Sequence, residues 1–319
     1  MHGAAITLVR RMLESEFIPD FLLASDMLDL SLVRSLLQAA HIAPRCVMYF
    51  HENQLVYPWS ERDPDKGLQR DRHYSFMNYS SALVADKVIF NSRYHRRSFL
   101  EQLPAFLSAF PDHQNQETVD IIRKKSQVIY PGVSFDVLDA GRTESHNKVP
   151  LILWNHRWEY DKNPETFFRV LKRVHDEGMH FELAVCGRSF PTSPKIFDQA
   201  KKDLALHIVH WGFVETAEEY RKWLWRSDIL PVTSHQDFFG YSAIEAMYCN
   251  TIPLLPDRLA FPEHIDDRQF FYSSDDELLQ KLRKLLSSPL PKFNVQEELR
   301  MRFDWRNVIG KYHRMFEET

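Results

Sequence analysis

Along most of this chain, short apolar runs alternate with stretches that have the apolar spacing of helices. The runs fall into two series, one between residues 20 and 130 and the other between residues 151 and 272. Strands that are buried on both faces are near-continuous apolar runs, and parallel strands need a crossover between them, usually a helix. The alternation therefore predicts an α/β protein with two Rossmann-like, doubly wound domains, each a parallel sheet covered by helices.

The same pattern predicts the individual elements and the domain borders. The expected strands lie at 20–24, 45–50, 86–91 and 127–130 in the first series, and at 151–155, 181–186, 207–211, 229–232, 252–255 and 269–272 in the second. We expect an N-terminal domain at 1–133, a C-terminal domain at 134–303 and a helix at 304–319 that packs back on the first domain. Because a helical pattern at 3–16 comes first, we expect the N-terminal domain to be truncated, without its first strand and loop.

Composition excludes several classes of protein. The nine glycines are scattered, so the chain has neither a dinucleotide-binding fingerprint nor a P-loop. Three distant cysteines fit a reducing compartment and argue against a disulfide framework. A net charge of −4 argues against bulk adhesion to nucleic acid but leaves a local basic patch open. No apolar run approaches a membrane span and no signal peptide is recognisable, so we expect no membrane contact.

The segment 235–247 (HQDFFGYSAIEAM) carries two carboxylates at the start of an expected helix. Asp237 precedes the helix, and Glu245 lies just over one turn into it. A carboxylate accepts hydrogen bonds from a pair of adjacent sugar hydroxyls. Backbone N–H groups at a helix N-terminus favour a diphosphate; here they belong to Phe239, Gly240 and Tyr241. The pattern alone fits equally well a plain capped helix, with Asp237 or Ser242 as the cap.

The segment 154–164 follows the first strand of the second series, at the sheet edge where such folds bind ligands. Arg157 and Lys162 could together neutralise a diphosphate. The alternative is that both are solvated surface cations, the commoner fate of such residues. Asn163 and Pro164 are suited to begin a helix, as the N-cap and the first helical residue.

The segment 50–58 (FHENQLVYP) places polar side chains directly after a buried strand. His51 and Glu52 could contact a substrate hydroxyl or take part in acid–base chemistry. The alternative is that the segment is an ordinary turn.

A positive cluster follows the third strand of the first series and consists of Arg93, Arg96 and Arg97. A solvated helix face is the alternative interpretation of such a run. The chain has no H-E-x-x-H or C-x-x-C spacing, so we expect no bound metal. It also has no G-x-S-x-G elbow of a serine hydrolase.

These residues carry a family resemblance. Asp237-x7-Glu245, with Gly240 between them and Arg157 and Lys162 before them, resembles the donor site of the group 1, family 4 glycosyltransferases of GT-B fold. Four longer strings resemble, more narrowly, the tRNA-queuosine α-mannosyltransferase family and its bacterial relatives, and they lie at 49–58, 90–99, 153–168 and 234–263. The resemblance spans nearly the whole chain.

The resemblance implies two domains that face a cleft, and a retaining transfer of mannose from GDP-mannose to queuosine in a tRNA anticodon. It implies that Glu245 binds the ribose, that Asp237 binds the donor sugar hydroxyls, and that Arg157 and Lys162 hold the diphosphate. His51 would face the donor sugar as a second catalytic residue. The implied acceptor-binding residues are Glu52, Asn53, Arg93, Arg96 and Arg97.

The resemblance also implies a cytoplasmic enzyme, or a nuclear one as well in a eukaryote, that requires no cofactor besides its donor. One departure is that the first carboxylate, Asp237, is usually Glu in the wider class. Nothing in the residues themselves distinguishes guanine from uracil in the donor. Two other functions stay open: transfer to a lipid or polysaccharide acceptor, and a non-catalytic module that binds a sugar nucleotide or RNA. Binding to tRNA predicts a steep salt dependence, because phosphate contacts release counterions.

Overall fold

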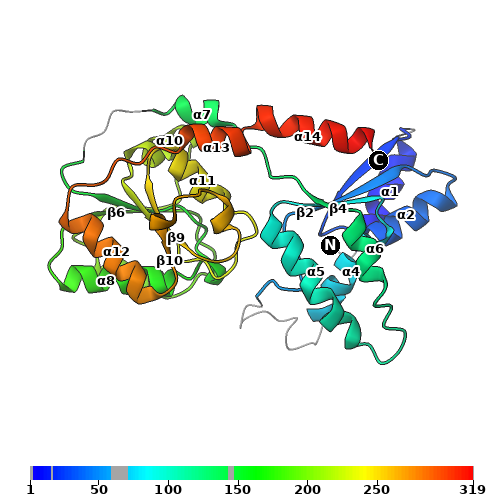
Figure 1. Ribbon diagram of the computed structural model, residues 1–319, viewed down its shortest axis with the longest axis horizontal. Coiled ribbons are helices and arrows are strands. Elements are labelled where there is room, and N and C mark those ends of the chain that lie inside the picture. The colour runs from blue at the N-terminus through cyan, green and yellow to red at the C-terminus, as the bar shows by residue number, and fades with distance from the viewer. Residues whose placement is uncertain (1–2, 16, 59–70, 143–146, 319) are drawn as a thin grey trace. The chain divides into compact units, whose positions relative to one another are not determined.

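The computed structural model describes residues 3–15, 17–58, 71–142 and 147–318. The chain forms two compact units, each with its own parallel sheet (Figure 1). The first unit comprises Met1–Pro131 together with Ile309–Thr319, and the second unit comprises Gly132–Val308. The expected fold class, two α/β domains built on parallel sheets, is confirmed.

The first unit holds a four-stranded sheet whose strands lie side by side in chain order. Its strands are β1 (Phe21–Ser25), β2 (Arg45–Phe50), β3 (Lys87–Phe90) and β4 (Ser126–Val128). Its helices are α1 (Ala4–Glu14), α2 (Leu30–Ala39), α4 (Asp71–Val84), α5 (Arg93–Ser108) and α6 (Thr118–Lys124). Strand β2 is buried along its whole length apart from Arg45, which is why its sequence RCVMYF has no polar alternation.

The second unit holds a six-stranded parallel sheet in the order β10-β9-β8-β5-β6-β7. These strands are β5 (Leu151–Trp154), β6 (Glu182–Cys186), β7 (Ile208–Gly212), β8 (Ile229–Pro231), β9 (Ile252–Pro256) and β10 (Phe271–Tyr272). The chain winds outward from β5 to β7, returns to pair β8 with β5, and then winds outward on the other side. The topological switch point therefore lies between β5 and β8, the place where open α/β sheets bind ligands.

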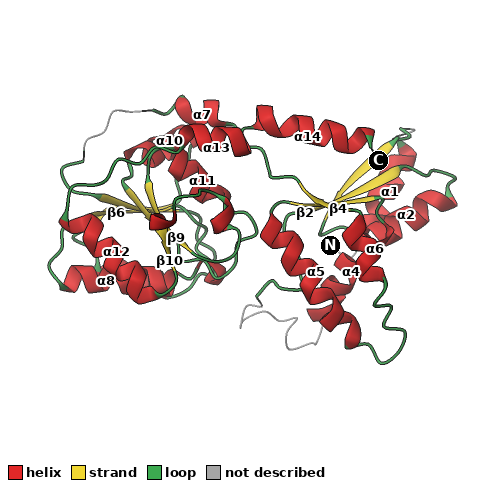
Figure 2. Ribbon diagram, viewed as in Figure 1, coloured by secondary structure: helices red, strands yellow, loops and turns green. Residues whose placement is uncertain are grey.

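Helices cover both faces of this second sheet, with α8 and α12 on one side and α10 and α11 on the other (Figures 1 and 2). The helices of this unit are α7 (Phe135–Asp139), α8 (Pro164–Asp176), α9 (Ile196–Asp203), α10 (Ala217–Arg226), α11 (Tyr241–Tyr248), α12 (Asp275–Ser287) and α13 (Gln296–Phe303). The predicted start of α8 is confirmed: the Asn163 side chain accepts a hydrogen bond from the Thr166 N–H, and Pro164 is the first helical residue.

The C-terminal segment differs in part from the expectation. The predicted helix appears as α14 (Trp305–Glu317), whose last residues count with the first unit. There Phe316 packs edge-to-face on Phe21, and Tyr312 stacks on Tyr49. A separate helix, α13, precedes it and was not predicted, because the apolar spacing of QEELRMRF is weak. Within the described residues, no helix has the length and apolarity to cross a bilayer.

Gly187, just after β6, provides a test of how tightly the loops at the switch point are packed. Its φ is +116°, and a Cβ atom there would lie 2.1 Å from the His156 carbonyl oxygen. We expect Gly187→Ala to lower the free energy of unfolding by about 2–4 kcal/mol, because backbone strain and overpacking add. Chemical denaturation followed by tryptophan fluorescence measures the loss.

Gly178→Ala is the matched control. Its φ of +74° is also left-handed, but a Cβ there has nothing within 4 Å. It should cost only the conformational penalty, about 1 kcal/mol. Equal losses in the two variants would contradict close packing at Gly187.

Candidate functional site

Two loops leave the neighbouring strands β5 and β8 at the switch point and are tied to one another. The backbone N–H groups of His235 and Gln236 donate to the carbonyl oxygen of Asp161, at 2.8 and 3.2 Å. The Thr233 hydroxyl donates to the Lys162 carbonyl oxygen at 3.0 Å. The two segments that the sequence singled out separately, 154–164 and 235–247, are therefore brought together as one structure.

A buried cation lies between these loops. The Lys162 ammonium group is 3.0 Å from the Asp237 carboxylate and 3.1 Å from the Asp161 carboxylate, and it also donates to the Gln236 carbonyl oxygen. The side chains of Lys162 and Asp237 are only 13% and 15% exposed. Because an unpaired buried charge is costly, each of these groups depends on the others.

The charges in this cluster hold each other ionised. Burial alone would lower the pKa of Lys162, but Asp237 and Asp161 overcome it, and the pKa is raised. Burial alone would raise the pKa of Asp237, but Lys162 and the Gly240 backbone N–H overcome it, and the pKa is lowered. Asp237 is thus an ionised acceptor at neutral pH, and in this structure the Gly240 N–H is directed to it.

The second predicted cation lies in a different environment. The Arg157 side chain is 56% exposed and forms an ion pair with Glu159 at 3.1 Å. Lys162 is therefore a buried, prepositioned charge, whereas Arg157 is a solvated one that can change its partner at low cost.

Gly240 begins helix α11 in the left-handed region, with φ at +78°. A Cβ at this position would lie 2.8 Å from the Phe261 ring and 2.9 Å from the His264 ring. His264 is buried and bonds to the Phe239 carbonyl oxygen, and the Phe239 ring packs against it. The turn before α11 is therefore held in place from inside the protein, which prepositions its backbone N–H groups.

The side chains at this turn have structural contacts of their own. Phe239 is buried and packs on Phe303. The Tyr241 phenol donates to the Gly132 carbonyl oxygen at 3.3 Å. Ser242 bonds to the ring of buried His156 at 2.9 Å. The Phe239 ring is thus a packing group. The role predicted for this residue, binding a diphosphate, falls to its backbone N–H.

Glu245 faces into the protein rather than into solvent. The Tyr220 hydroxyl donates to its carboxylate at 3.1 Å, and the Asn155 amide donates to the Tyr220 oxygen at 3.3 Å. Burial raises the pKa of Glu245 to about 7, which the bond from Tyr220 only partly offsets. Glu245 therefore exchanges a proton near neutral pH, whereas the lowered pKa of Asp237 keeps that carboxylate ionised at neutral pH.

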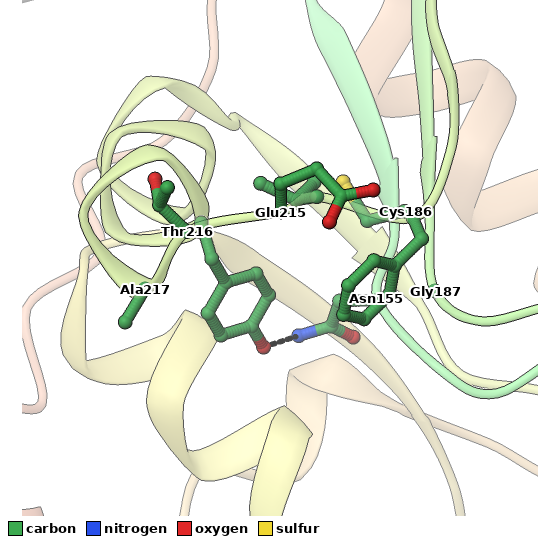
Figure 3. Close-up of a pocket in the computed structure, with 9 residues that line it drawn as sticks. Asn155, Cys186, Gly187, Glu215, Thr216 and Ala217 are labelled. Atoms are coloured by element: carbon green, nitrogen blue, oxygen red, sulfur yellow. Dashed lines mark hydrogen bonds between the residues drawn. The ribbon is translucent and has the colours of Figure 1, made fainter.

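A pocket of about 330 Å³ opens beside Glu245, at the carboxyl ends of β5, β6 and β7 (Figure 3). Asn155 and Tyr220 line it and are joined by the hydrogen bond drawn in Figure 3. The Asn155 side-chain oxygen is buried and has no hydrogen-bond partner. Among the described residues, this unpaired acceptor belongs to a side chain that lines the pocket.

The sequence analysis missed these lining residues, which are Asn155, Cys186, Gly187, Phe213, Val214, Glu215, Thr216, Ala217 and Tyr220. They come from the carboxyl ends of β5, β6 and β7 and from the first turns of α10, so no local pattern joins them. His156 and His264 were missed as well, since each is a single histidine whose role depends on its buried neighbour.

In the first unit, His51 follows β2 with an exposed ring. The carboxylate of buried Asp26 accepts from the His51 backbone N–H at 2.8 Å and lies 3.4 Å from its ring nitrogen Nδ1. The Asn91 amide donates to the His51 carbonyl oxygen at 2.8 Å. Asn53 is fully buried, and neither polar atom of its side chain has a hydrogen-bond partner among the residues that the structure describes. Glu52 is half-buried beside the Gln54 amide.

The predicted arginine cluster begins helix α5, which the Ser92 hydroxyl caps. Arg93 and Arg97 are exposed, whereas Arg96 is half-buried and donates to the Arg123 carbonyl oxygen at 3.2 Å. The cluster therefore includes solvent-facing cations, as a surface for a polyanion requires. Within the part of the chain that the structure describes, no three His, Cys, Asp or Glu side chains gather as a metal site would need.

His264 gives a pH-dependent test of this framework. Burial lowers its pKa to about 4, although the bond to Phe239 opposes this effect. Between pH 6.5 and 4 the unfolded chain binds the proton and the folded one does not, so the stability that is fully present above pH 6.5 is lost as the pH falls. We expect His264→Gln to reduce the slope of the unfolding free energy in this window by about 1.4 kcal/mol per pH unit at most. Denaturation at several pH values measures the slope, and a variant with the wild-type slope would contradict the assignment.

Comparisons with known proteins fit this geometry. Residues 1–133 match the family model described as tRNA-queuosine alpha-mannosyltransferase N-terminal, and residues 139–304 match the model of glycosyl transferases group 1. The tRNA-queuosine alpha-mannosyltransferase of Drosophila melanogaster is 34% identical over 294 residues, which is 86% of this chain and 75% of the relative.

Solved structures show the same fold at low identity. A glycosyltransferase from Rickettsia africae is 18% identical with a TM-score of 0.68, and the match covers 98% of this chain and 80% of that one. Sucrose-phosphate synthase from Thermosynechococcus elongatus is 16% identical with a TM-score of 0.71, and the match covers 99% and 79%. On the two family models and the fly relative, this chain belongs to the tRNA-queuosine alpha-mannosyltransferase family of the group 1 glycosyltransferases.

Proposed function

We propose that this glycosyltransferase moves a mannosyl group from GDP-mannose to a hydroxyl of queuosine in the anticodon of a tRNA, with retention at the anomeric carbon. The observation that carries the donor half of this proposal is the pair of carboxylates on either side of the Gly240 turn. Asp237 is ionised, because its pKa is lowered, and the pKa of Glu245 is raised to about 7. Both residues lie at the switch point of one sheet. The acceptor half rests on membership of the family.

The donor fits along this edge in a fixed order. The pocket beside Glu245 takes the base, where the unpaired Asn155 oxygen accepts a hydrogen bond. Glu245 accepts from the ribose hydroxyls, since its carboxylate adjoins the pocket through Tyr220. The diphosphate lies at the start of α11 near Lys162 and Arg157, and Asp237 accepts from hydroxyls of the mannosyl group.

The reaction needs stabilisation of the departing diphosphate. The bond between the anomeric carbon and the phosphate oxygen breaks, the bond to the acceptor oxygen forms, and the acceptor proton passes to the departing phosphate. Lys162 is already fixed in place, so it stabilises the developing charge without reorganisation. Arg157 is free to exchange Glu159 for the phosphate. We assign no enzymic nucleophile, so the acceptor enters on the face from which the phosphate leaves.

The first unit supplies the acceptor side of the proposal. His51, fixed through its backbone by Asp26 and Asn91, faces the donor sugar, and Glu52 and Asn53 contact the nucleoside. Arg93, Arg96 and Arg97 contact tRNA phosphates. The reaction then takes place where tRNA is present, in the cytoplasm or in the nucleus of a eukaryote.

The test is transfer from GDP-mannose to queuosine-containing tRNA, with the same tRNA lacking queuosine as a blank. We expect Asp237→Asn to lower kcat/KM by about 100-fold or more, because it removes an ionised acceptor from the sugar and the buried partner of Lys162. The matched control is Asp176→Asn, which removes a carboxylate from an exposed lysine pair on α8 and should leave transfer unchanged.

Three results would contradict the proposal. Full activity of Asp237→Asn would remove the donor-site assignment. Transfer to a lipid or polysaccharide but not to tRNA would overturn the acceptor. Tight GDP binding without any turnover would favour a non-catalytic module.

The raised pKa of Glu245 gives a separate prediction. Ribose hydroxyls donate to the ionised carboxylate, so below pH 7 binding must first release the proton. We expect the Kd for GDP to rise by up to about tenfold per pH unit as the pH falls from 7 to 5. Calorimetry should show Glu245→Gln to bind more weakly at pH 8 and to lack most of this dependence. A wild-type Kd that does not change between pH 8 and 6 would contradict the role of Glu245.

A further inference from the structure

One charged side chain that lines the pocket is exposed to solvent. Glu215 lies in the connection between β7 and α10 and lines the pocket together with Asn155 and Tyr220. Its side chain is exposed. Among the described residues, Glu215 takes part in no hydrogen bond and no ion pair, whereas nearby Glu218 is paired with Lys222. In Figure 3 its carboxylate extends toward Cys186, another residue that lines the pocket.

An aromatic face lies on the same connection, two residues earlier. Phe213 lines the pocket with its side chain 52% exposed, which is unusual for so large an apolar group. The planar guanidinium of Arg188 lies 5.6 Å above the centre of its ring. The ring thus already holds a flat group, and a flat heterocycle can stack on it as well.

The position of Glu215 relative to Glu245 is what a nucleoside requires. Tyr220, which donates a hydrogen bond to Glu245, and Glu215 both line this pocket. A base attached to a ribose at Glu245 can therefore enter the pocket that Phe213 and Glu215 also line. In the placement that we infer, the edge of the base farthest from the ribose meets the Glu215 carboxylate.

Nucleobases differ in what they offer a carboxylate on that edge. Guanine presents two adjacent donors, N1–H and the 2-amino group, which match the two oxygens of a carboxylate. Uracil presents one N–H between two carbonyl oxygens that the carboxylate repels. Adenine presents an acceptor beside its single amino donor. Only guanine satisfies both carboxylate oxygens.

We propose that Glu215 is the specificity-determining residue that selects a guanine nucleotide, accepting hydrogen bonds from N1–H and the 2-amino group while the base stacks on Phe213. This inference rests on the proposed function, because it needs the pocket beside Glu245 to hold the donor base. It adds a physical reason for guanine that the sequence alone did not provide.

The experiment compares GDP with inosine diphosphate, which differs only in lacking the 2-amino group. Calorimetry on the full chain at pH 8 gives Kd values for GDP, inosine diphosphate and UDP. We expect the wild type to prefer GDP to inosine diphosphate by about tenfold, and to UDP by more. Glu215→Ala should bring the ratio for GDP and inosine diphosphate close to one. Using a ratio cancels the general effect of removing a negative charge near an anionic ligand.

Two further variants keep the inference separable from the proposed function. Glu218→Ala, which removes a carboxylate from the following helix α10 at a position that does not line the pocket, should keep the wild-type ratio. Phe213→Ala should weaken all three nucleotides by a similar factor, because stacking does not depend on the base.

An unchanged ratio in Glu215→Ala, with Phe213→Ala weakening all three, would overturn the role of Glu215 and leave the pocket intact. If neither Phe213→Ala nor Glu245→Gln changed the Kd of any of the three nucleotides, the pocket would not be the base site. The proposed donor site would then be wrong as well.

Discussion

The buried ion cluster of Lys162 with Asp161 and Asp237 is the interaction on which the site depends. A lysine that is almost fully buried must be paired, and its partners come from the two loops that follow β5 and β8. Those strands are neighbours at the switch point. The sheet order therefore places the two loops side by side, and the pairing of buried Lys162 with both carboxylates holds them there. In the proposed function, the Lys162 ammonium group is thus fixed in place at the diphosphate before any ligand arrives.

The two carboxylates of the Asp237-x7-Glu245 pattern have opposite electrostatic surroundings. Asp237 contacts a buried cation, so its pKa is lowered, and it accepts hydrogen bonds at any physiological pH. Glu245 accepts a hydrogen bond from the Tyr220 hydroxyl, and burial raises its pKa to about 7. In the proposed function, Asp237 stays ionised and binds the donor sugar at every physiological pH. Glu245 binds the ribose, and below pH 7 this binding releases a proton.

Much of the fold could be predicted from the chain because each element is locally consistent. The apolar run at 45–50 and the Asn163–Pro164 start of α8 specify their structures without distant help. Helix α13 could not be predicted in this way, since its apolar face is defined by what it packs against. Among the candidate residues, Lys162 and Asp237 were named separately, and only the sheet order brings them to 3.0 Å.

By itself, the sequence determined the fold class, two parallel-sheet domains, and the two segments that contain the carboxylates and cations of the proposed donor site. The reason is that strand burial and helix starts are set by residues close together in the chain. Only the tertiary structure decided which charges are buried together, that Glu245 lies against Tyr220, and that Phe213 and Glu215 share a pocket with Asn155. Burial and long-range pairing set those properties, and both arise from contacts between segments more than fifty residues apart, such as that between Asn155 and Tyr220.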